Sequence, residues 1–207
     1  EYFARQGYEV TQQGLYTGRG GIYTYLNTER DLGVTMELLE SFGGNSTFNA
    51  PPFDPALGLG TDRIVQVGII VRDIEASSKR LSEVLGLPLP EIMVTPGYAQ
   101  VETTYHGQPS EATAKLAFFN CGQVTLELIE PDEKPSTWRD YLDQHGEGAH
   151  HIAMIVENTQ RAVDHLAKFG IPVVQQGLYG DRSGIYTYMD SVPVIGTTLE
   201  LLENFKR

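Results

Sequence analysis

Apolar and polar positions in the C-terminal part of the chain follow a strand pattern, then a helix pattern, and then three more strand patterns. An apolar run over residues 152–156 is typical of a strand, and Asn158 has the position of a helix N-cap. Gly170 marks the end of the helix, whose apolar face consists of Ala162, Val163, Leu166 and Phe169. Three alternating segments follow, "IPVVQQG", "SGIYTYMD" and "TTLELLE", separated by Gly, Pro, Asp and Ser. The pattern predicts a β-α-β-β-β unit.

A more divergent unit of the same kind begins at Val65. The segment "VQVGIIV" predicts its first strand, and Asp73 precedes a helix as its N-cap. Gly86 ends this helix, whose apolar face consists of Ile74, Leu81, Val84 and Leu85. The segments "KLAFFN" and "VTLELIE" predict later strands. Between the two units, "PDEKPSTWRDYLDQHGEGA" is expected to contain a short helix capped by Ser136.

The end of the C-terminal unit occurs a second time, at the start of the chain. The phrase "QQGLYTGRGGIYTYL" at residues 12–26 returns as "QQGLYGDRSGIYTYM" at residues 175–189. Residues 1–42 align without a gap with residues 164–205, and half of the paired positions are identical. The opening "EYFARQG" matches "DHLAKFG", the end of the predicted helix. The chain therefore contains tandem copies of one structural unit, the first of them partial.

These repeats predict a division of the chain into three parts. Residues 1–43 are expected to form a partial unit, residues 44–61 a linker, and residues 62–207 a complete module made of units 65–130 and 150–205. A partial unit leaves sheet edges to be covered. We therefore expect the protein to associate, with a homodimer as the simplest arrangement.

Composition and charge narrow the classes of partner. An apolar fraction of 41% is sufficient for a packed core, and the apolar stretches are shorter than the roughly 20 residues of a membrane span. Cys121 is the only cysteine, which excludes internal disulfides and favours a cytoplasmic protein. With 15 basic and 27 acidic residues the net charge is −12, which argues against nucleic-acid and membrane-surface partners. A small-molecule ligand is the remaining expectation.

Paired β-α-β-β-β units that end in "TLELIE" and "TLELLE", with "GEGAHHIA" at the start of the second, resemble the vicinal oxygen chelate superfamily. This superfamily includes glyoxalase I, methylmalonyl-CoA epimerase, extradiol dioxygenases and bleomycin-resistance proteins. The resemblance implies an α+β fold in which paired units form a curved half-barrel sheet. It also implies a divalent metal ion in the cavity where two units meet, held by the first and last strands of each unit.

Carried over position by position, the resemblance places four metal ligands: Gln66, Glu127, His151 and Glu200. Alternate residues of a strand face the same way, so the neighbouring Val65, Val67, Leu126 and Leu128 are expected to face the helices. His150 is expected on the strand face opposite to His151, so at most one of the two is a ligand. Nitrogen and oxygen ligands suit Zn, Ni, Co, Mn or Fe.

Such a site implies proton-transfer chemistry. A metal ion polarises a substrate carbonyl and stabilises an enediolate, while Glu127 and Glu200 act as base and conjugate acid on a neighbouring carbon. The expectation is an epimerase or isomerase of glyoxalase type, or a lyase, acting on a small hydroxy- or ketoacid or its thioester. Tyr186 and Tyr188 share one strand face and are candidates for substrate binding, as is Arg182 in the preceding turn. The alternative for the tyrosines is packing under the helices, and for Arg182 a solvated turn.

Other members of the superfamily remain as alternatives. Glutathione-dependent glyoxalases commonly have an arginine and an asparagine where this chain has Ile70 and Pro131. Epimerases usually have His and Gln at the positions of Gln66 and Glu127, and extradiol dioxygenases need two His, one of which is replaced by Gln66. The alternative from another class is a metal-free binding protein similar to bleomycin-resistance proteins.

Overall fold

The protein is described by a computed structural model, which covers residues 2–16, 18–43 and 53–206. Half of the predicted linker, residues 44–52, lies outside the described residues. No helix in the described part of the chain is long and apolar enough to cross a membrane.

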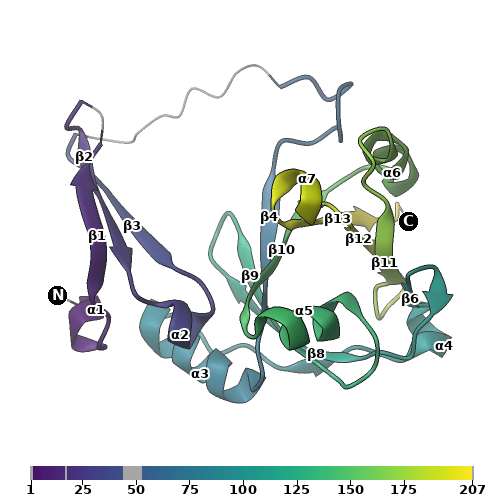
Figure 1. Ribbon diagram of the computed structural model, residues 1–207, viewed down its shortest axis with the longest axis horizontal. Helices are drawn as coiled ribbons and strands as arrows, with labels where there is room; N and C mark the ends of the chain where they lie inside the picture. Colours follow the sequence, from purple (N-terminus) through teal and green to yellow (C-terminus); the bar gives the residue numbers. More distant parts are fainter. Residues whose placement is uncertain (1, 17, 44–52, 207) are drawn as a thin grey trace.

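A curved mixed sheet of ten strands forms a half-barrel and makes up most of the molecule (Figure 1). Its strands, in spatial order, are β5 (Met93–Val94), β8 (Ala114–Asn120), β9 (Thr125–Pro131), β4 (Ile64–Ile70), β10 (Gly148–Ile155), β13 (Thr198–Asn204), β12 (Gly184–Met189), β11 (Val173–Leu178), β6 (Thr104–Tyr105) and β7 (Gln108–Pro109). Strands β4 and β10 pair antiparallel at the centre, and each pairs parallel with the last strand of its own unit, β9 or β13. The predicted α+β half-barrel fold is therefore confirmed.

Side-chain caps fix the three longer helices as the sequence predicts. Helix α3 (Ile74–Leu85) begins with Asp73 accepting a hydrogen bond from the Ala76 amide and ends at Gly86 in the left-handed conformation. Helices α5 (Thr137–His145) and α6 (Thr159–Ala167) begin in the same way, with Ser136 and Asn158 as caps. Short helices are α4 (Tyr98–Val101) and α7 (Val192–Ile195).

One residue of the predicted apolar face of α6 does not face the core. Helix α6 ends at Ala167, and Phe169 lies beyond it with a relative exposure of 60%. The prediction that Phe169 packs inward is wrong, because the helical period no longer holds once the helix has ended.

The N-terminal residues form a separate antiparallel sheet of three strands. The sheet consists of β1 (Val10–Leu15), β2 (Gly21–Leu26) and β3 (Met36–Ser41). The short helix α1 (Tyr2–Arg5) precedes it, and α2 (Glu29–Leu32) connects β2 with β3. Its pairing repeats that of β11, β12 and β13, because Tyr25 pairs with Glu37 as Tyr188 pairs with Glu200. Both copies also have an irregularity at the corresponding point of the first strand.

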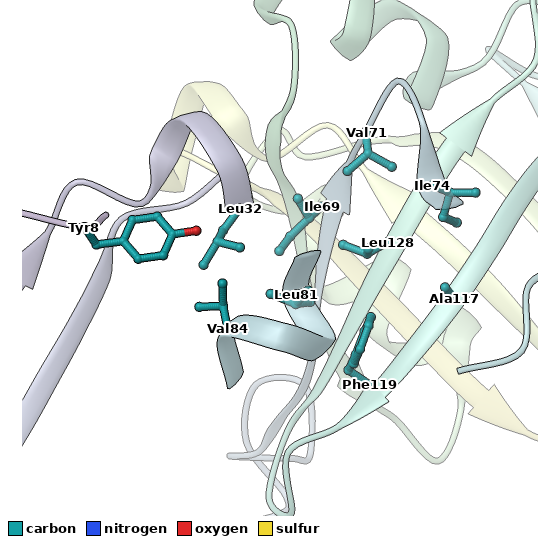
Figure 2. Packing of buried hydrophobic residues seen from close by; sticks show 10 residues of the cluster. All are labelled: Tyr8, Leu32, Ile69, Val71, Ile74, Leu81, Val84, Ala117, Phe119 and Leu128. Atoms are coloured by element: carbon teal, nitrogen blue, oxygen red, sulfur yellow. The ribbon is translucent and has the colours of Figure 1, made fainter. Parts of the chain in front are cut away.

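A shared apolar cluster joins the small sheet to the outer face of the large one (Figure 2). Tyr8 and Leu32 of the N-terminal part pack with Ile69 of β4 and with Leu81 and Val84 of α3. All five side chains are at most 5% exposed. The N-terminal copy therefore lies against α3, away from the concave side of the half-barrel.

Candidate active site

Four strands at the centre of the large sheet bring the predicted ligand residues together on the concave face. Gln66 lies on β4, Glu127 on β9, His151 on β10 and Glu200 on β13. In the register of the parallel pairs, Glu127 is opposite Gly68 and Glu200 is opposite Ala153. The alternate residues face the other way, since Val67, Leu126 and Leu128 pack in the cluster under α3. Strand alternation in two repeated units therefore builds one polar group from four distant positions.

The polar atoms of these residues are in close contact. Gln66 Nε2 donates a hydrogen bond of 2.7 Å to Glu127 Oε2 and lies 3.5 Å from Glu200 Oε2. His151 Nε2 lies 3.5 Å from Glu127 Oε2 and 3.2 Å from Glu200 Oε2. Glu127, His151 and Glu200 are 5%, 1% and 3% exposed, so two carboxylates and one imidazole share a buried point.

Burial and charge shift the protonation of this group. Burial by itself lowers the pKa of His151, but the negative charges of the adjacent Glu200 and Glu127 outweigh it and raise the pKa to about 9. Burial raises the pKa of Glu127, and the adjacent His151 offsets part of this rise. The two carboxylates therefore favour a positive charge between them. In the absence of a bound cation, the protonated His151 ring supplies this charge.

The donor set also suits a divalent cation. His151 Nε2 is buried and lacks a hydrogen-bond partner among the described residues, although it faces two carboxylates. Neighbouring ligands around an ion bonded at about 2.0–2.2 Å lie about 3.3–3.6 Å apart in a tetrahedron, close to the His151 separations. However, no group of three or more His, Cys, Asp or Glu side chains in the described part of the chain has the arrangement of a metal site. Gln66 would also have to turn its amide oxygen inward, so the ligand set stays a prediction.

Gly68 provides the space for the His151 ring. A Cβ atom at Gly68 would lie 1.9 Å from Cε1 of His151 and 2.5 Å from its Nε2. Gly68 faces the cavity from the middle of β4, between Gln66 and Ile70. A glycine inside a strand indicates such a close approach, and this signal was present in the sequence.

His150 contacts His151 directly, contrary to the expectation that the strand separates the two side chains. Their Nδ1 atoms are 3.0 Å apart and both residues are buried. The cause is a shift of register between Ala149 and His151 where β10 pairs with β4, typical of a β-bulge. Burial, followed by the charge of His151, lowers the pKa of His150 well below its ordinary value. His150 therefore stays neutral, and its Nδ1 contacts the Nδ1 of His151.

The two tyrosines predicted to bind substrate line a cavity of about 340 Å³ that opens above the polar group. The Tyr188 hydroxyl accepts a hydrogen bond of 3.1 Å from Trp138 Nε1, and the Tyr186 hydroxyl lies 3.2 Å from Thr103 Oγ1. Burial raises the pKa of Tyr186 to about 12, and that of Tyr188 well above its ordinary value. Both hydroxyls are therefore neutral. Tyr188 also packs with Trp138 and Leu142 of α5, so the structure combines cavity lining with packing against a helix, and substrate binding by the tyrosines stays a prediction. The wall residue Trp138 was missed by the sequence interpretation.

Arg182 lies outside this group. Its guanidinium donates hydrogen bonds to the Gln100 carbonyl and to Glu102 of the segment around α4, at 2.8 and 2.7 Å. Both side chains of the ion pair are at least half exposed. These contacts tie the β11–β12 turn to α4, and a substrate contact for Arg182 stays an untested prediction.

A family model places the chain among known proteins. Residues 65–188 match the model of the glyoxalase/bleomycin resistance protein/dioxygenase superfamily. The chain belongs to this superfamily. Its members include the vicinal oxygen chelate enzymes that the sequence resembles.

Individual relatives are more distant. The uncharacterised protein YqjC of Bacillus subtilis is 33% identical over 94 residues, which are 45% of this chain and 57% of YqjC, so the match spans little more than half of that relative. A hypothetical protein of Bacillus halodurans has a similar structure, with a TM-score of 0.51, 21% identity, and coverage of 70% of this chain and 96% of that one. The methylmalonyl-CoA epimerase of Mycobacterium tuberculosis also has a TM-score of 0.51, with 20% identity and coverage of 70% and 89%. At these identities the solved structures support the fold alone.

Proposed function

We propose that the protein is a metal-dependent epimerase or isomerase of glyoxalase type that moves a proton next to the carbonyl of a small hydroxy- or ketoacid or its thioester. The observation that carries the proposal is the meeting of Glu127, Glu200, His151 and Gln66 at one buried point on the floor of a cavity. Two carboxylates buried without a cation are costly, so this arrangement favours a bound positive ion.

Each residue has a role that follows from its position. Gln66, His151 and the two glutamates would hold the ion, which when bound supplies the Lewis acidity that makes the neighbouring C–H acidic. Glu127 and Glu200 approach the polar group from strands on either side of β4 and β10. One carboxylate removes a proton and the other returns it, to the same carbon for epimerisation or to the neighbouring carbon for isomerisation.

Metal content tests the first half of the proposal. We would purify the protein without a histidine tag, reconstitute it with each candidate divalent ion, and measure bound metal per chain. Close to one ion per chain is expected for the native protein, and loss of that ion for Glu200→Ala. Glu37→Ala is the matched control, because Glu37 has the same place in the N-terminal copy but is exposed on β3. Absence of metal after reconstitution, or equal loss in both variants, would contradict the proposal.

Proton exchange tests the second half. Incubation of the metal-loaded protein with 2-hydroxy- and 2-ketoacids in D₂O should introduce deuterium at the carbon next to the carbonyl. Glu127→Gln should slow this exchange by about 10²–10⁴-fold, the usual contribution of a general acid or base. Metal binding without exchange on any acid or thioester would contradict the proposed reaction. Absence of both metal and exchange would favour the second candidate, a metal-free small-molecule binding protein, which the apolar walls of the cavity also support.

A further inference from the structure

The walls of the cavity above the polar group are chemically uniform. Its floor has three polar residues of the candidate site, Gln66, Glu127 and Glu200. The walls are mainly aliphatic and aromatic, and include Val101, Leu116, Phe118, Trp138, Leu178 and Leu202. A volume of about 340 Å³ is near the lower end for small-molecule sites. The space above the floor therefore suits a compact apolar group.

Most polar side chains on the walls, other than Tyr179, are already paired inside the protein. Thr95 Oγ1 accepts a hydrogen bond from the Ala114 amide, and Thr103 Oγ1 is paired with the Tyr186 hydroxyl. The Tyr188 hydroxyl accepts from Trp138. A polar group of a ligand placed against these walls would lose its water and gain little in return.

The charged residues around the cavity also disfavour a second anionic group on the ligand. Two acidic residues, Glu127 and Glu200, line the cavity, and no Lys, Arg or His lines it in the described part of the chain. Arg182 is two residues from the lining residue Gly180, but its guanidinium is bound to Glu102 and to the Gln100 carbonyl and does not line the cavity. A second carboxylate or a phosphate placed against the walls would thus find no basic side chain among the lining residues to pair with.

We infer that the cavity selects a monocarboxylic 2-hydroxy- or 2-oxoacid whose side chain is uncharged and apolar, either branched aliphatic or aromatic. This inference rests on the proposed function only in its head group, because the carboxylate and its neighbouring oxygen lie at the ion-binding floor. The selection against a second anionic group comes from the walls and holds for the protein with or without an ion.

The chain contains its own reporter for this cavity. Trp138 is the only tryptophan, it is 4% exposed, and it lines the cavity with its indole N–H on Tyr188. Intrinsic fluorescence therefore reports on the cavity without a label. We would titrate the metal-loaded protein with 4-methyl-2-oxopentanoate and with 2-oxoglutarate, which share a head group but end in an isopropyl group or a second carboxylate. At least about tenfold tighter binding of 4-methyl-2-oxopentanoate is expected, which is about 1.4 kcal/mol.

A pair without the chelating head separates the two proposals. 4-Methylpentan-2-one is a simple ketone that ends in the isopropyl group, and 4-oxopentanoate is a simple ketone that ends in the carboxylate. Both are titrated into the protein without metal. Quenching by the neutral ketone at lower concentration than by the acid supports the wall selection even if no metal ever binds. Phe118→Lys, at a wall position that is 39% exposed, should bring the affinities for 4-methyl-2-oxopentanoate and 2-oxoglutarate closer together by at least threefold. Equal or tighter binding of the dianion by the native protein would overturn the inference.

Discussion

At the residue scale, the site depends on one imidazole ring held between two strands. His151 is 1% exposed, its Nε2 faces two carboxylates, and its Nδ1 lies 3.0 Å from that of His150. The ring occupies the space that a side chain at Gly68 would fill. The four polar residues were predicted from the resemblance to the vicinal oxygen chelate superfamily, whereas the contact of Gly68 with the His151 ring became visible only in the structure.

Gly68→Ala should displace the His151 ring and weaken metal binding. The added Cβ would lie 1.9 Å from Cε1 of His151, which is far closer than van der Waals contact, so the ring must move. Bound metal per chain should fall at least about tenfold at limiting ion concentration, a loss of about 1.4 kcal/mol. Gly20→Ala is the control, since nothing lies within 4 Å of its added Cβ. Elemental analysis together with circular dichroism would check this, and unchanged metal content in a folded Gly68→Ala protein would contradict it.

Arg182→Ala should have little effect on ligand affinity. The side chain is tied to Gln100 and Glu102 at the surface, and both partners in the ion pair are at least half exposed. We expect less than about twofold change in the Kd measured by Trp138 fluorescence, and a loss of about 0–1 kcal/mol in the free energy of unfolding. A tenfold rise in the Kd for the acid, but not for the neutral ketone, would instead assign Arg182 to the substrate carboxylate.

At the element scale, the two copies of the repeat have the same local structure and different surroundings. Thr28 and Ser191 hold the same turn, because each hydroxyl donates to a carbonyl six residues on and accepts from the amide eight residues on. The short helices α2 and α7 follow these turns, and both end at a left-handed glycine. Yet Leu32 at the end of α2 is 5% exposed against α3, while Ile195 at the same place in α7 is 51% exposed.

This difference allows a matched test of packing. Leu32→Ala should lower the free energy of unfolding by about 2–3 kcal/mol, because it opens a cavity between α2 and α3. Ile195→Ala, in the same local structure, should change it by no more than about 0.5 kcal/mol, since the side chain is exposed. Urea unfolding of both variants measures the two values. Similar losses would show that α7 is also covered in solution.

At the scale of the whole molecule, an apolar cluster joins the small sheet to the large one. Tyr8 and Leu32 belong to one side, and Ile69, Leu81 and Val84 to the other (Figure 2). Removal of the N-terminal copy from this contact would expose apolar surface on α3 and β4 to water. We therefore expect the two parts to unfold together.

Coincident unfolding transitions would establish this coupling. Trp138 reports on the large sheet alone, since it is the only tryptophan, whereas far-ultraviolet circular dichroism reports on both sheets. The two signals should follow one curve in urea with the same midpoint. A circular dichroism change that precedes the fluorescence change, with its size in proportion to the N-terminal strands, would show that the small sheet melts first.

The sequence by itself determined the order of the longer helices and strands and the caps at Asp73, Ser136 and Asn158. These features follow from local chemistry and from hydrophobic periods, which repeated units display twice. The resemblance of the sequence to a known superfamily supplied the four polar positions on β4, β9, β10 and β13. Only the tertiary structure decided what surrounds those positions. The contact of His150 with His151 needs a bulge, the capture of Arg182 by Glu102 joins residues 80 apart, and the packing of Leu32 on α3 depends on another part of the chain. No local pattern encodes contacts of this kind, because each depends on the path of a second segment through space.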